Sequence, residues 1–124
     1  MAQKYISGDI VVTKDGIRIV DKPIDSYHYD LIHPRDHTKC LNVEIEKIKP
    51  APLISFSLEK NGWELSHEFY KSPNKEGETV CLTSKDGFSW KAYIGRQQLR
   101  KNINSLPDLQ HLLFGLGLNH EMEV

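Results

Sequence analysis

The sequence is poor in the features that would quickly place it in a functional class. Its 16 basic and 17 acidic residues leave a formal net charge of −1, so the whole chain has no attraction for nucleic acid or an anionic membrane. No apolar run approaches the roughly 20 residues of a membrane span. Residues 1–8 also lack the apolar core of a secretory signal. We therefore expect a cytoplasmic protein that binds neither bulk nucleic acid nor membrane.

Disulfide and cofactor motifs are missing as well. The two cysteines, Cys40 and Cys81, lie far apart and form no Cys-x-x-Cys pair, so we expect two reduced, packed thiols. The chain contains no nucleophile elbow, no His-Glu-x-x-His motif, no phosphate-loop lysine and no dinucleotide fingerprint. We accordingly predict no catalytic residue, no cofactor and no metal.

One segment, residues 105–118, has a long and regular helical period. Ser105 and Asp108 are suited to cap its beginning, and Gly117 is suited to end it in a left-handed conformation. An apolar stripe of this kind needs a surface to cover, so we expect the helix to pack on a sheet. The stripe consists of Leu106, Leu109, Leu112, Leu113 and Leu116.

The first 49 residues have the pattern of short antiparallel strands. Asp15-Gly16 is a favoured hairpin signal between two β-branched runs. Four or five such strands within about 50 residues suit a small twisted or barrel-like sheet, which leaves few open edges. The expected strands are 9–13, 17–21, 27–32 and 39–48.

The prolines of residues 49–52 interrupt every regular pattern and predict a boundary inside a single domain. A β-rich lobe (1–49) would precede an α+β lobe (53–124). The second lobe begins with a short helix over 53–60 that Asn61-Gly62 would end. The C-terminal helix would then pack on three antiparallel strands, and the predicted fold class is α+β. These three strands are expected at 63–70, 79–84 and 88–94.

Two motifs, at residues 50–53 (P-A-P-L) and 106–116 (L-P-D-L-Q-H-L-L-F-G-L), bracket most of the second half. With the Gly8-Asp9-Ile10-Val11 start, they resemble a family of small proteins common in Bacteroides-type bacteria and their phages. Members carry I-x-P-I-P-L-T-E-E and, near the end, Y-V-H-Q-L-Q-N-L-Y-F-A-L-T. Here Leu106-Pro107-Asp108 replaces the Tyr-Val-His part, and Ser55-Phe56 stands where the family has two acids.

No activity comes with this resemblance, which implies a phage or mobile-element context. In that context many small proteins counter host defence. Some of them are non-enzymatic sponges that oligomerise and sequester cyclic-nucleotide signals.

A locally positive stretch lies late in the chain, because no acidic residue occurs between Asp86 and Asp108. Cationic side chains suit phosphate contacts, and flat aromatic rings can stack on a base, so this mixture predicts a nucleotide-like ligand. The competing interpretation is a solvated strand face whose aromatics belong to the core. The candidate ligand-binding residues are Lys91, Arg96, Arg100 and Lys101, with Trp90 and Tyr93.

A second cluster collects three histidines, two acids and a thiol within thirteen residues. Zinc accepts all of these ligands. However, Pro34 interrupts the helical spacing of His33 and His37, and no paired cysteines accompany them. A polar loop is therefore preferred over a metal site. The members are His28, Asp30, His33, Asp36, His37 and Cys40.

The sequence thus favours a non-enzymatic, homo-oligomeric phage or mobile-element protein that sequesters a small anionic, nucleotide-like signal in the host bacterial cell. The alternative is a protein-binding adaptor that blocks a host or phage factor through strand edges or the leucine helix. A third possibility is a small hydrolase of the same signals.

Overall fold

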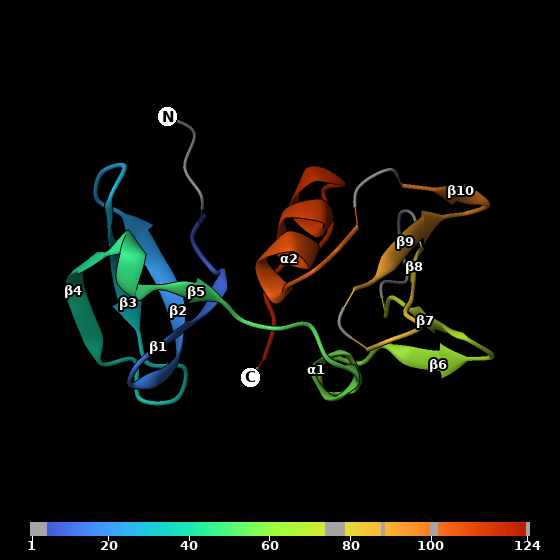
Figure 1. Cartoon of the computed structure of the whole chain (residues 1–124), viewed down its shortest axis with the longest axis horizontal. Coiled ribbons are helices and arrows are strands. Elements are labelled where there is room, and N and C mark those ends of the chain that lie inside the picture. Colours follow the sequence, from blue (N-terminus) through green and yellow to red (C-terminus); the bar gives the residue numbers. More distant parts are fainter. Residues whose placement is uncertain (1–4, 74–78, 88, 100–101, 124) are drawn as a thin grey trace. The chain divides into compact units, whose positions relative to one another are not determined.

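The computed structural model describes residues 5–73, 79–87, 89–99 and 102–123 (Figure 1). The chain divides into two compact units, with the division between Ala51 and Pro52. This division falls inside the proline-rich boundary at residues 49–52. Cys40 lies in the first unit and Cys81 in the second, and both are free, partly buried thiols.

The first unit is a five-stranded antiparallel sheet with the order β4-β3-β2-β1-β5. The expected hairpin at Asp15-Gly16 is confirmed, since it joins the first two strands. A 3₁₀ helix, η1 (Ile45–Lys47), occupies residues that were expected to continue a strand to residue 48. The bounds are β1 (Ile10–Thr13), β2 (Gly16–Pro23), β3 (His28–Ile32), β4 (Lys39–Glu44) and β5 (Lys49–Pro50).

The sheet of the first unit is open, with β4 and β5 as its edges. Of the two forms expected from the sequence, twisted or barrel-like, the barrel is wrong, because the strand order does not close. The physical reason lies in β5, which has only two residues, one of them Pro50 without an N–H to extend the ladder. In the hydrophobic core of this unit, the rings of Tyr5 and Tyr29 meet edge to face with their centroids 5.5 Å apart. The core around them contains Val11, Val20, Leu31 and Ile48.

The second unit joins two helices to another five-stranded antiparallel sheet, with the order β10-β9-β8-β7-β6. The α+β class is confirmed, but the three expected strands are five. His67 has a φ of 58° and turns the chain back, so the segment predicted as one strand is a hairpin. The bounds are α1 (Ser55–Lys60), β6 (Glu64–Ser66), β7 (Phe69–Lys71), β8 (Val80–Thr83), β9 (Lys91–Ile94), β10 (Gln97–Gln98) and α2 (Leu106–Gly115).

The predicted C-terminal helix and both of its ends are confirmed in α2. The Ser105 Oγ accepts the Asp108 N–H at 3.2 Å, which satisfies a free donor of the first turn. At the other end, Gly117 has a φ of 73°. Leu106, Leu109 and Leu113 are buried, while Leu112 and Leu116 are only partly covered.

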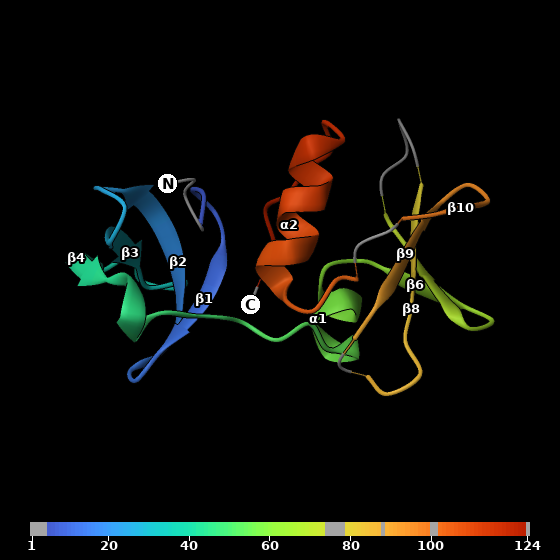
Figure 2. The same ribbon diagram turned by 45° about the horizontal axis from the view of Figure 1, so that its top comes forward.

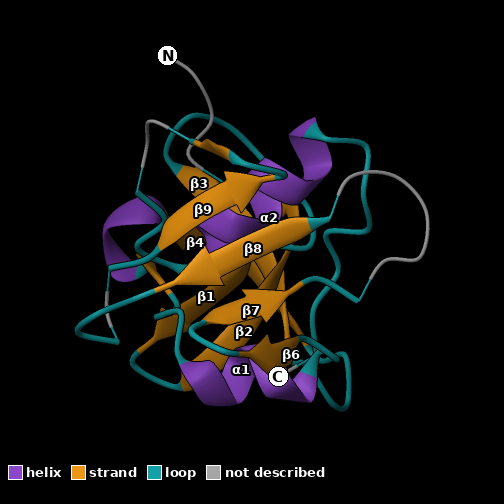
Figure 3. Ribbon diagram, turned by 90° about the vertical axis from the view of Figure 1, so that its right-hand side faces the viewer, coloured by secondary structure: helices purple, strands orange, loops and turns teal. Residues whose placement is uncertain are grey.

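Both helices of the second unit lie on one side of its sheet, as Figures 1, 2 and 3 agree. Strand alternation therefore gives the sheet a buried and an outer face. Tyr70, Leu82 and Ala92 follow one another across three strands and are buried. Their sequence neighbours Lys91 and Tyr93 fall on the outer face.

Candidate functional site

The outer face of the second sheet brings two predicted ligand-binding residues together. Lys91 and Tyr93 are two positions apart on β9, so their side chains share a face. In the register with β8, Lys91 lies opposite Thr83 and Tyr93 lies opposite Cys81. Both residues line one surface hollow. The remaining lining residues are Glu68, Phe69, Thr83, Ser84, Lys85, Asp86 and Ser89.

The ring of Tyr93 is held by two neighbours. It meets Phe69 edge to face with a centroid separation of 5.6 Å. The Tyr93 hydroxyl lies 3.3 Å from the Oε1 of Gln98 and donates to it. A ring that is already held in place loses little conformational freedom when a ligand stacks on it.

A tight turn at residues 84–87 forms part of the rim of the hollow. The Asp86 Oδ1 accepts the Ser89 N–H at 2.9 Å, and the Ser84 Oγ accepts the Gly87 N–H at 2.9 Å. These bonds hold the described turn residues Ser84, Asp86 and Gly87 and tie Ser89 to them. Lys85, which the sequence analysis did not select, projects from this turn and lines the hollow.

The charge of the lining is balanced. Lys85 and Lys91 face the same hollow as Glu68 and Asp86. A phosphate that contacts Lys91 must therefore avoid Glu68, because like charges in one small site repel. With two cations and two anions in its lining, the hollow offers no general electrostatic attraction for anions.

Two other predicted ligand-binding residues, Trp90 and Arg96, lie away from the hollow. Trp90 is 3 % exposed, and its Nε1–H donates to the Leu53 carbonyl at 2.9 Å, so it is a core residue here. Arg96 is exposed in the turn between β9 and β10 and does not line the hollow. Arg100 and Lys101 lie outside the described residues.

Thr83, Ser84, Lys85 and Phe69 also line the hollow and were not among the residues predicted from the sequence. Thr83 faces Lys91 through the β8–β9 register, which the tight turn between the two strands could have indicated. Phe69 reaches the site from β7, and nothing in its sequence neighbourhood predicts this position.

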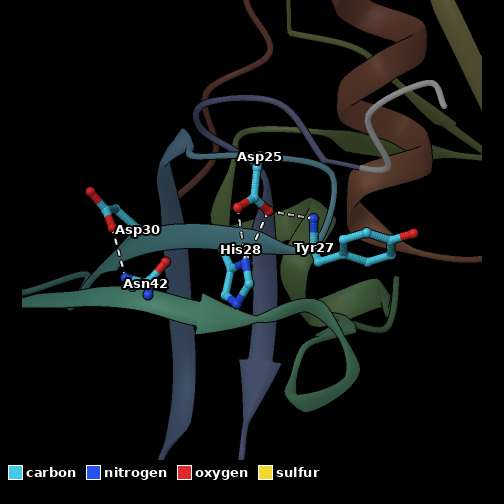
Figure 4. A network of polar contacts seen from close by, with 5 residues as sticks. All are labelled: Asp25, Tyr27, His28, Asp30 and Asn42. Carbon is cyan, nitrogen blue, oxygen red and sulfur yellow. Dashed lines mark hydrogen bonds and ion pairs between the residues drawn. The ribbon is translucent and has the colours of Figure 1, made fainter.

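The histidine-rich segment forms separate local contacts instead of one centre (Figure 4). The His28 Nδ1 lies 2.9 Å from the Asp25 Oδ1, which also accepts the Tyr27 N–H at 2.8 Å. The hydrogen bond from Tyr27, followed by that from His28, lowers the pKa of Asp25. Independently, the Asp30 Oδ1 accepts the Asn42 N–H at 2.8 Å. Among the residues that the structure describes, no group of three or more His, Cys, Asp or Glu could hold a metal ion.

Comparison with protein-family models, with curated proteins and with solved structures gives no match. The resemblance to the Bacteroides and phage family therefore stays a prediction. None of the helices in the described ranges combines the length and apolar character that crossing a bilayer requires.

Proposed function

We propose that this chain is a non-enzymatic binding protein that captures a small anionic, nucleotide-like ligand in the hollow on the outer face of its second sheet. The proposal rests on one observation: Lys91 and Tyr93 line the same hollow. An ammonium group can pair with a phosphate. A phenol ring can stack on a base, a contact worth about 1–3 kcal/mol.

Sequestration is the form of binding that suits such a site. A protein that removes a signal by stoichiometric binding needs no nucleophile and no general base. The resemblance to phage proteins supplies the context, which is a host bacterial cytoplasm and a defence signal. We include homo-oligomerisation in the proposal, because small domains commonly enclose ligands at subunit boundaries.

Calorimetry with a panel of cyclic nucleotides and ADP-ribose derivatives tests the proposal. Lys91→Ala should weaken binding about ten- to hundredfold, since a charge-assisted hydrogen bond contributes about 1.5–3 kcal/mol. Tyr93→Ala should weaken binding by removing the stacking surface. Glu68→Gln should tighten binding, because it removes a repulsive carboxylate from the lining.

Arg96→Ala is the matched control. It removes a cation that follows the same strand but does not line the hollow, so ligand affinity should stay within about twofold. Absence of heat from every ligand would overturn the proposal. Conversion of a nucleotide to product, seen by mass spectrometry, would support the hydrolase in its place.

A further inference from the structure

The last described residues of the chain, 119–123, form an irregular segment that we call the tail. It follows the end of α2 and contains neither helix nor strand. The Gln110 Nε2–H donates to the His120 carbonyl at 3.0 Å. Met122 is only 8 % exposed, whereas Glu121 and Glu123 on either side of it are exposed. The His120 ring also meets Phe114 of α2 edge to face at a centroid distance of 5.1 Å. One apolar side chain, this ring contact and a few hydrogen bonds thus hold the tail on the second unit.

The side-chain amide of Asn61 makes two hydrogen bonds to the backbone of the tail, one through its oxygen and one through its nitrogen. The Glu123 N–H donates to the Asn61 Oδ1 at 2.6 Å, and the Asn61 Nδ2–H donates to the Glu123 carbonyl at 3.0 Å. A neighbouring β-strand would offer the same donor and acceptor pair, so this contact recognises any peptide backbone. The Asn61 Nδ2 also donates to the Ser57 carbonyl at 2.8 Å, which orients the amide before a peptide arrives.

The surroundings of the tail add side-chain preference. Met122 borders a cavity of about 250 Å³ that Trp63 and Leu113 also line. This space, lined by polar as well as apolar residues, lies beside the methionine and leaves room for a larger side chain. Lys60 lines a neighbouring hollow together with Glu121 and Glu123, which gives the groove a charge complementary to acidic residues.

We propose that Asn61, Trp63 and Leu113, with Lys60 at the rim, form a peptide-binding groove that the tail occupies as an internal competitor. The partner is a segment of another protein with the chemistry of the tail: a bulky apolar side chain between two acidic residues. Exchange is feasible because release of the tail breaks no helix and no sheet ladder. This groove is independent of the hollow at Lys91.

The test uses a fluorescent peptide, Asn-His-Glu-Met-Glu-Val, and the full chain carrying Met122→Asp, which releases the tail. Fluorescence anisotropy should show binding to this variant and at least tenfold weaker binding to the wild type, whose own tail competes at an effective concentration of about 1 mM. Adding Asn61→Ala to Met122→Asp should abolish binding. A peptide with aspartate in place of methionine is the matched control and should not bind.

A second release variant guards against misfolding of the first. Glu123→Pro removes the N–H that Asn61 accepts and leaves Met122 in place. It should also bind the peptide, and circular dichroism verifies the fold of each variant. The proposal is overturned if folded release variants fail to bind the peptide up to about 1 mM, or if the wild type binds it equally well.

Discussion

Replacement of Trp90 by phenylalanine distinguishes a core residue from a ligand-stacking residue. Trp90→Phe removes the donor that pairs with the Leu53 carbonyl at 2.9 Å. An unpaired buried carbonyl costs about 1–3 kcal/mol, and the smaller ring adds roughly 1 kcal/mol of cavity cost at about 24 cal/mol per Å³. The free energy of unfolding of the second unit should therefore fall by about 2–4 kcal/mol.

Urea unfolding followed by tryptophan fluorescence measures this loss. The chain has 2 tryptophans, and both lie in the second unit, so their emission reports on that unit alone. With a urea m-value of about 1–3 kcal/mol/M, the midpoint should move down by about 0.7–4 M.

Tyr93→Phe is the matched control, because it changes a partly exposed aromatic by one hydroxyl and should cost less than about 1 kcal/mol. The core assignment would be refuted if Trp90→Phe left the urea midpoint unchanged and weakened ligand binding. Trp90 would then be a ligand-binding residue, as the sequence predicted.

Three further predictions concern single residues. Asp30→Ala should destabilise the first unit by about 1–3 kcal/mol in urea unfolding followed by circular dichroism, because the Asn42 N–H loses its acceptor; Asp30→Asn, which keeps an oxygen, should cost less. His67→Gly should raise the melting temperature in calorimetry, since the left-handed φ of 58° costs an L-residue about 1–2 kcal/mol and the flexibility of glycine offsets only part of this. Burial, followed by repulsion from Tyr29 and Asp9, raises the pKa of Tyr5 to about 12 from 10.0. Its contribution to stability should be complete below pH 10 and lost towards pH 12, with the phenolate titrating late in the ultraviolet spectrum.

Each of these predictions has a contrary result. Equal costs for the alanine and asparagine variants at residue 30 would show that the Asn42 N–H gains nothing from the carboxylate. A lower melting temperature for His67→Gly would mean that the imidazole makes a stabilising contact. Ionisation of all tyrosines near pH 10 would show that Tyr5 is open to solvent.

Local chemistry determined the elements that need no distant partner. The cap at Ser105 and the left-handed Gly117 act within one turn of α2, so the sequence was enough to place that helix. The Asp15-Gly16 hairpin follows from the same locality. The turn at His67 was not predicted, because a left-handed histidine has no strong sequence signal. The hairpin around it was therefore expected as one strand.

From the sequence, Trp90 and Tyr93 were predicted as aromatics of one binding site, because a local pattern could not say which of the two is buried. Tertiary packing decided this, because the Leu53 carbonyl receives the Trp90 indole and leaves Tyr93 outside with Phe69. The hydrogen bond between Asn61 and Glu123 connects residues that are 62 positions apart in the sequence. A contact at such a separation depends on where the folded chain brings two backbones together, which no local pattern specifies.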